Sequence, residues 1–157
     1  GADGDRARAH AAEEAARAEG ERRAAHARAR AALLERIGAR LRDLREVLPG
    51  FRMRQVVDAD GEGYALARTE ETIGPAGTPA RLFSRLEVRL VPYDGTHDRL
   101  AVTVRGVVRD REKTPQRFWR PLEGGAAAEG VVSDAAAWVE GALVAYAEDF
   151  ADADEMR

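Results

Sequence analysis

Apolar side chains between residues 33 and 48 recur at the spacing of a helix. The strong helix formers Ala, Arg, Glu and Leu dominate residues 6–48, and Pro49-Gly50 follows as a stop signal. The sequence therefore predicts one long N-terminal helix over residues 6–48. Its apolar positions, spaced alternately three and four residues apart, are named here the leucine seam: Leu34, Ile37, Leu41, Leu44 and Leu48.

The leucine seam has two interpretations. A coiled coil needs about three to four heptads and the seam covers about two, which favours packing on the sheet of its own domain. Pairing with a second subunit is the other interpretation, and a long helix can do both. Upstream the same register meets Arg30 and Arg23. We therefore expect residues 1–32, with His10 and His26, to form a solvated helical extension, and residues 33–157 to form a single domain.

The middle of the chain alternates apolar and polar residues, which is the pattern of β-strands. Clusters rich in Asp, Gly and Pro interrupt the alternation and indicate turns. Because successive strands are joined by short turns, we expect antiparallel hairpins. The predicted strands cover residues 51–58, 64–73, 81–93, 100–110 and 116–122.

The last segment predicts a loop followed by an amphipathic helix. Residues 123–132 resemble a Gly/Ala loop, Ser133 is a good N-cap, and a helix then runs to about residue 152. Its buried stripe comprises Trp138, Val139, Ala142, Leu143, Tyr146 and Phe150. The fold class is therefore α+β, with a long N-terminal helix, about five antiparallel strands in consecutive hairpins and a C-terminal amphipathic helix packed on the sheet.

Charge is distributed unevenly along the 157 residues. Residues 1–122 carry an excess of five positive charges, whereas residues 123–157 carry Arg157 alone against nine Asp and Glu. This asymmetry favours electrostatic pairing within or between subunits over general nucleic-acid binding. Lys113 is the only lysine, and this preference for arginine indicates a GC-rich bacterial genome.

Arginines occupy the outward positions of several predicted strands. The set is Arg52, Arg54, Arg85, Arg89, Arg105 and Arg109. Such a face can bind a small anionic ligand, and its alternative is a solvated face held by cross-strand ion pairs. Glutamates among the arginines and a pI of 5.7 disfavour nucleic acid.

Two turns suggest a metal site, and neither completes one. Residues 58–63 match the first half of a calcium-binding loop, but their flanks predict strands where that loop needs helices. Asp94, His97 and Asp98 offer only a few ligands from one turn. Both segments are explained as ordinary turns, so we expect no metal and no cofactor.

Nucleophiles are scarce. The chain has no cysteine, Ser84 points with the core face of its strand, and Ser133 is explained as a helix cap. Glu70 and Glu71 are adjacent on a strand and point to opposite faces. Common nucleophilic catalysis is therefore disfavoured, while carboxylate chemistry from separate strands stays open.

These patterns predict a non-enzymatic interaction or scaffolding module that self-associates through its N-terminal helix, with the leucine seam as interface. The alternative is a small-anion-binding domain that uses the arginine-rich face. The expected partner is a second copy or another protein. The chain contains no run of about 18 apolar residues, so the sequence predicts no membrane span. The chain begins with Gly1, so a signal segment removed earlier is compatible with it, and both a cytoplasmic and an extracytoplasmic location fit.

Overall fold

The computed structural model describes residues 1–95, 98–122 and 126–155 of the chain. The elements in chain order are α1 (Ala2–Val47), β1 (Arg52–Asp58), β2 (Gly61–Ile73), the short 3-10 helix η1 (Pro75–Gly77), β3 (Pro79–Leu90), β4 (Arg99–Val108), β5 (Arg111–Glu112), β6 (Gln116–Pro121) and α2 (Ala126–Glu155). The predicted α+β class and its element order are confirmed.

Strands that are neighbours in the sheet are also neighbours in the sequence. The order is β1-β2-β3-β4, and every pair is antiparallel. On its outer side β4 pairs with β5 at one end and with β6 at the other. These two strands act as one edge strand that is interrupted at residues 113–115, where Pro115 has no N–H for the ladder. The predicted consecutive hairpins are confirmed, with a short additional strand before the last one.

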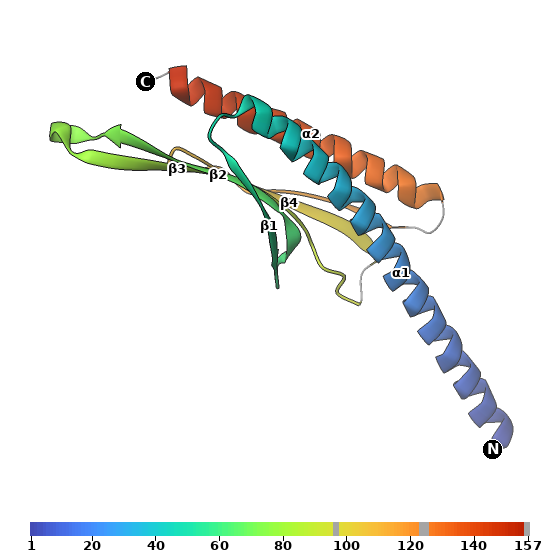
Figure 1. The fold of residues 1–157 in the computed structure, drawn as a ribbon. Helices are drawn as coiled ribbons and strands as arrows, with labels where there is room; N and C mark the ends of the chain where they lie inside the picture. Colours follow the sequence, from blue (N-terminus) through green and yellow to red (C-terminus); the bar gives the residue numbers. More distant parts are fainter. Residues whose placement is uncertain (96–97, 123–125, 156–157) are drawn as a thin grey trace.

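Both helices lie side by side on one face of the sheet, and the described chain leaves the opposite face uncovered, as Figure 1 shows. The covered face is the apolar one, because alternate strand residues point to opposite sides. Its buried side chains include Leu66, Leu86, Val88, Val102 and Phe118. They form one core with Leu33, Ile37 and Leu41 of α1 and Val139 and Leu143 of α2. We call the uncovered side of the sheet the open face.

Two tyrosine rings set how closely the helices approach the sheet. Tyr64 of β2 lies against Gly38 of α1, where an added Cβ would be 3.1 Å from the ring Cε2. Tyr146 of α2 lies over Gly106 of β4, where a Cβ would be 3.1 Å from the ring Cδ2. The Tyr146 hydroxyl donates to the Val107 carbonyl at 2.8 Å, and burial raises the pKa of this tyrosine. At either glycine an added Cβ would make the tyrosine ring shift by a few tenths of an ångström.

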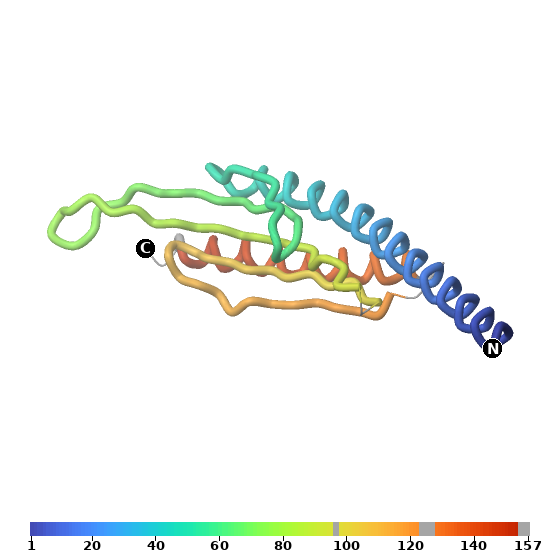
Figure 2. The backbone as a smooth tube through the Cα atoms, turned by 90° about the horizontal axis from the view of Figure 1, so that it is seen from below, coloured from blue at the N-terminus to red at the C-terminus, as the bar shows by residue number. Residues whose placement is uncertain are grey.

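The first part of α1 extends beyond the sheet and beyond α2, as Figure 2 shows. All residues from Ala2 to Arg17 are exposed, and the first buried one is His26. We call residues 2–22 the arm, which at about 1.5 Å per residue is roughly 30 Å long. Contact with the body thus begins inside the range 1–32 that was expected to be solvated. The division of the chain into an extension and a domain over 33–157 stays a prediction.

Helix α2 begins earlier than the sequence predicts. It starts at Ala126, so the expected loop over residues 123–132 is wrong for the part that the structure describes. Ser133 lies inside the helix and is not its N-cap. Val132 is buried and Val131 packs on the core. Burial of these valines outweighs the low helix propensity of Gly130, which had favoured a loop.

The glycine contacts give a test of this packing. Gly38→Leu should lower the free energy of unfolding by about 1–3 kcal/mol, because the new side chain displaces the Tyr64 ring. Gly141→Ala should raise it by up to about 1 kcal/mol, because this exposed helical glycine has nothing within 4 Å of its added Cβ. Urea denaturation of both variants checks the pair. If the two substitutions changed the free energy of unfolding equally, the contact of Gly38 with the Tyr64 ring would be contradicted.

Candidate functional site

Five of the six arginines singled out in the sequence lie on the open face. They are Arg52, Arg54, Arg85, Arg89 and Arg105. The register of β1 to β4 places Arg54, Glu87 and Arg105 in one row across the sheet, with Ala65 between the first two. The sequence thus predicted both the strand positions and the side of the sheet for these five residues.

An ion-pair network occupies the centre of the open face. Arg85 Nη2 donates to Glu87 Oε2 at 3.0 Å, and Arg89 pairs with Glu87 and also with Asp58, at 2.6 Å from Nη1 to Oδ1. Hydrogen bonding to Glu87 raises the pKa of Arg89. The Asp60 backbone N–H, with a smaller contribution from Arg89, lowers the pKa of Asp58. These groups neutralise one another. The pairs of Glu87 lie within β3, and the pair of Arg89 with Asp58 joins two strands, as the cross-strand interpretation expected.

The flanks of the open face differ from its centre. Arg52 and Arg54 on β1, and Arg105 on β4, are exposed and form no ion pair with any residue that the structure describes. Their guanidinium groups face solvent with their donors unused. The centre of the open face therefore carries ion pairs, whereas its two sides carry positive charge that no described residue matches.

Arg109 lies on the helix side of the sheet, which corrects the expectation that it points outward. It follows the last residue of β4 with a φ of 45°, and Asp110 follows at 67°, so the two residues form the turn into β5. The backbone N–H of Arg109 donates to Ser84 Oγ at 2.9 Å, and that of Asp110 donates to the Phe83 carbonyl at 2.8 Å. Because Arg109 leaves the strand conformation, the alternation of side chains between the two faces of the sheet ends at this residue.

The Arg109 side chain joins a buried cluster that the sequence did not reveal. Its Cζ lies 3.9 Å from the centroid of the Phe150 ring, and its Nη1 donates to the Phe150 carbonyl at 2.8 Å. Its Nε donates to Glu70 Oε2 at 3.0 Å, and Arg68 pairs with the same carboxylate at 3.1 Å. The side chains of Arg109 and Glu70 are only 7% and 9% exposed. The cluster ties the β2–β3 hairpin to α2.

This cluster lines a groove of about 700 Å³ at the C-terminal ends of the two helices. Leu44, Leu48 and Phe150 contribute apolar walls, and Val47 and Val144 are exposed at 68% and 51%. Arg68 and Arg109 both pair with Glu70 in the wall of the groove, so these three groups hold the fold together at this end.

The leucine seam faces the core of its own domain. Ile37, Leu41 and Leu48 are buried, and Leu34 and Leu44 are half-buried against them. Packing within the domain, the first interpretation, is confirmed. Ile37, Leu41 and Leu48 therefore have little surface to offer a second subunit, whereas Leu34 and Leu44 stay partly exposed. Their use as an interface stays a prediction.

His26 is buried, which corrects the expectation of a solvated histidine. It is 1% exposed, and its ring centroid lies 5.2 Å from that of Tyr93. A sequence signal was present, because His26 lies three residues before Ala29 and seven before Leu33 and so shares their helix face. The Nδ1 atom of His26 and the Oδ1 atom of Asp98 are buried without a hydrogen-bond partner among the described residues.

The surroundings of His26 lower its pKa. Burial is the largest cause, and the positive charge of Arg30 adds to it. The carboxylates of Asp98 and Asp94 and a hydrogen bond with the Arg99 backbone act in the opposite direction with smaller effect. The lowered pKa favours the neutral form of His26.

The described residues offer few groups for metal binding or for nucleophilic chemistry. They contain no group of three or more metal-ligating side chains, and His97 lies outside the described residues. The turn at residues 58–61 is held by a 2.9 Å hydrogen bond from the Asp60 N–H to Asp58 Oδ1, which fits a hairpin turn.

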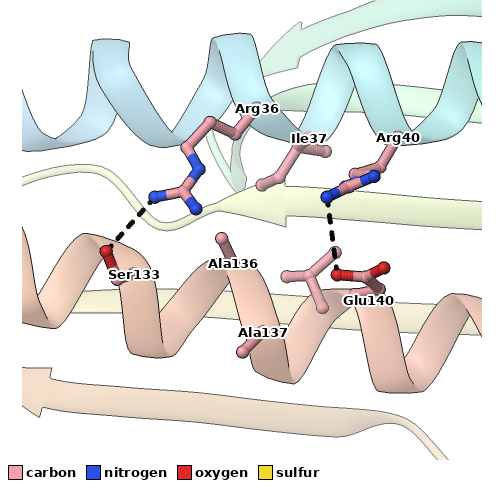
Figure 3. A pocket seen from close by; sticks show the side chains of 8 residues that line it. Arg36, Ile37, Arg40, Ser133, Ala136, Ala137 and Glu140 are labelled. Carbon is pink, nitrogen blue, oxygen red and sulfur yellow. Dashed lines mark hydrogen bonds and ion pairs between the residues drawn. The ribbon is translucent and has the colours of Figure 1, made fainter.

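The serines take part in the packing of the fold. Ser84 is buried, as expected, and accepts the Arg109 N–H. Figure 3 shows Ser133 facing Arg36, 3.4 Å from its Nη1, and Glu140 facing Arg40 at 3.8 Å. These contacts bridge α1 and α2 across a cavity of about 90 Å³, which is below the usual size of a ligand pocket.

Comparison with known proteins gave no match among protein-family models, curated proteins or solved structures. Among the residues that the structure describes, no helix is both long enough and apolar enough to cross a membrane. The function must therefore be argued from the geometry of this chain.

The two classes of arginine give a direct test. Arg109→Ala should lower the free energy of unfolding by about 3 kcal/mol, because it leaves the buried Glu70 carboxylate with fewer partners. Arg105→Ala should leave the unfolding curve unchanged, because this exposed side chain pairs with no described residue. Urea denaturation of the two variants distinguishes the roles. An unchanged curve for Arg109→Ala would contradict a structural role for its guanidinium.

The buried histidine predicts a pH dependence of stability. Because folding lowers the pKa of His26, the unfolded chain binds a proton more readily below about pH 6.5. Stability should therefore be highest above that pH and should fall as the pH drops from about 7.5 to about 5.5. His26→Gln should show a smaller fall in urea denaturation over the same range. If stability fell equally in both proteins, His26 would not be the cause of the pH dependence.

Proposed function

We propose that this chain is a non-enzymatic interaction module whose arm pairs with the arm of a second copy. The observation that carries the proposal is the exposure of the arm. All of its first sixteen residues, from Ala2 to Arg17, are exposed, and α1 reaches no buried position before His26. The module thus presents an ordered helix of about 30 Å outside its own core.

The arm lacks the packing that stabilises most helices in proteins. Tertiary burial of an apolar face usually supplies that stability. The arm instead relies on alanine propensity and on exposed pairs such as Asp5–Arg8 and Glu19–Arg23, each worth about 0.2–0.5 kcal/mol. A partner that buries one side of the arm would supply the stabilisation that tertiary packing gives to other helices.

The side of the arm that would be buried follows from the geometry of α1. His26, Ala29 and Leu33 lie on the buried side of the helix. The same side of the arm, at steps of three or four residues back from His26, carries Arg22 and then Ala18, Ala15 and Ala11. Small side chains let two helix backbones approach closely, so the stretch from Ala11 to Ala18 can pack against an identical one.

Charge along α1 favours an antiparallel pair. Residues 2–14 carry four Asp and Glu against two Arg, whereas residues 15–30 carry five Arg against two Glu. An antiparallel arrangement places the acidic segment of each arm beside the basic segment of the other. The resulting two-fold contact uses the same surface on both copies and closes as a dimer.

Sedimentation equilibrium tests the arm. The protein should form dimers in a concentration-dependent manner, and Ala11→Glu/Ala18→Glu should raise the dimer dissociation constant at least about tenfold, because buried carboxylates would face each other across the pair. The matched control is Ala9→Glu/Ala24→Glu, which adds the same charge on the opposite side of the helix.

Dimers that persist in both double variants, or a protein that stays monomeric at the highest attainable concentration, would refute pairing through the arm. Weakening by the control to the same extent would assign the effect to net charge and would also refute it. Circular dichroism should show unchanged helix content in all variants.

A further inference from the structure

The open face carries far more positive than negative charge. Its arginines, placed on this side by the strand register, are Arg52, Arg54, Arg81, Arg85, Arg89, Arg99, Arg105 and Arg117. Its carboxylates are Asp58, Glu71, Glu87 and Glu112. The excess of four positive charges belongs to one surface of a chain whose net charge is −3.

Three of these four carboxylates already have an arginine partner, and the fourth, Glu112, is exposed on the short edge strand β5. Asp58 pairs with Arg89 at 2.6 Å, Glu71 with Arg81 at 3.7 Å, and Glu87 with both Arg85 and Arg89. The unmatched arginines lie on the two sides of this network. Arg52 and Arg54 lie on β1, and Arg105 and Arg117 lie on β4 and β6. All four are exposed, and none forms an ion pair with a described residue.

The spacing of these arginines excludes one small anion as a shared ligand. Arg54 and Arg105 lie in one row but three strand steps apart, which at about 4.8 Å per step is roughly 14 Å between their backbones. Glu87 lies in the same row between them. An anion placed midway would meet this carboxylate. The surface therefore fits a ligand whose negative charges are themselves separated.

We infer that the open face is a docking surface for an acidic polypeptide segment of a partner protein. In an extended chain, side chains four residues apart point the same way and lie roughly 14 Å apart, which matches the separation of the two arginine pairs. One carboxylate meets Arg52 and Arg54, and another meets Arg105 and Arg117. The paired carboxylates at the centre set the spacing and disfavour ligands with one concentrated charge.

The aromatic residues of this face favour a polypeptide over single-stranded nucleic acid. Nucleic-acid platforms place exposed rings among the basic residues so that bases can stack. Here Phe83 and Trp119 lie on different strands outside the row of Arg54 and Arg105. The Trp119 ring already has Arg99 stacked 5.8 Å from its centroid.

Binding of a fluorescent oligo-glutamate peptide, long enough to cross the sheet, tests the docking surface. The full chain should bind the peptide, and binding should weaken as salt rises. Arg54→Glu/Arg105→Glu should raise the dissociation constant at least about tenfold. Arg28→Glu/Arg42→Glu is the matched control, since both arginines are exposed on α1 and pair with no described residue. It should change the dissociation constant by less than about twofold.

Three outcomes would overturn the inference. Equal weakening by both double variants would mean a response to net charge alone. Citrate or inorganic phosphate bound as tightly as the peptide, with the same dependence on Arg54 and Arg105, would indicate a small-anion site. Tighter binding of single-stranded DNA with that dependence would indicate a nucleic-acid surface. Arg54→Glu/Arg105→Glu changes neither the arm nor the basic segment over residues 15–30, so dimerisation of this variant, measured by sedimentation, stays an independent result.

Discussion

One constraint organises this protein: only one face of its sheet is apolar, and two helices must bury their apolar sides on that face. Leu33, Ile37 and Leu41 of α1 meet the sheet beside Val139 and Leu143 of α2. The Gly38–Tyr64 and Gly106–Tyr146 contacts set the depth of the two helices. Because both helices are used on one side, no element that the structure describes covers the arm or the open face.

Much of this arrangement follows from periodicity. Alternation along β2, β3 and β4 was enough to place Arg54, Arg85 and Arg105 on the side away from the core, and the seam of α1 was enough to identify a packing face. Periodicity works for these residues because they stay in regular strands and helices, where the direction of a side chain depends only on its position.

The sequence-based predictions were wrong where regular geometry ends or where tertiary contact overrides propensity. Arg109 has a positive φ, so strand alternation no longer applies to it. His26 shares the buried helix face of Ala29 and Leu33, a local signal that was present, but its ring contact with Tyr93, sixty-seven residues later, could not be read from any local pattern. Helix α2 extends through Gly130 because Val132 is buried in the core. The cluster of Arg109, Glu70 and Phe150 likewise joins three separate elements.

The two proposed surfaces would reinforce each other without sharing residues. The arm leaves one end of the molecule, whereas the open face lies on the side of the sheet away from both helices (Figure 1). An antiparallel pair of arms would therefore hold two open faces apart and leave both accessible. A partner with two acidic segments would then bind with avidity, because its second segment meets the second face at a high effective concentration. Loss of the arm would weaken the binding of such a two-segment partner, whereas the binding of a single acidic segment would not change.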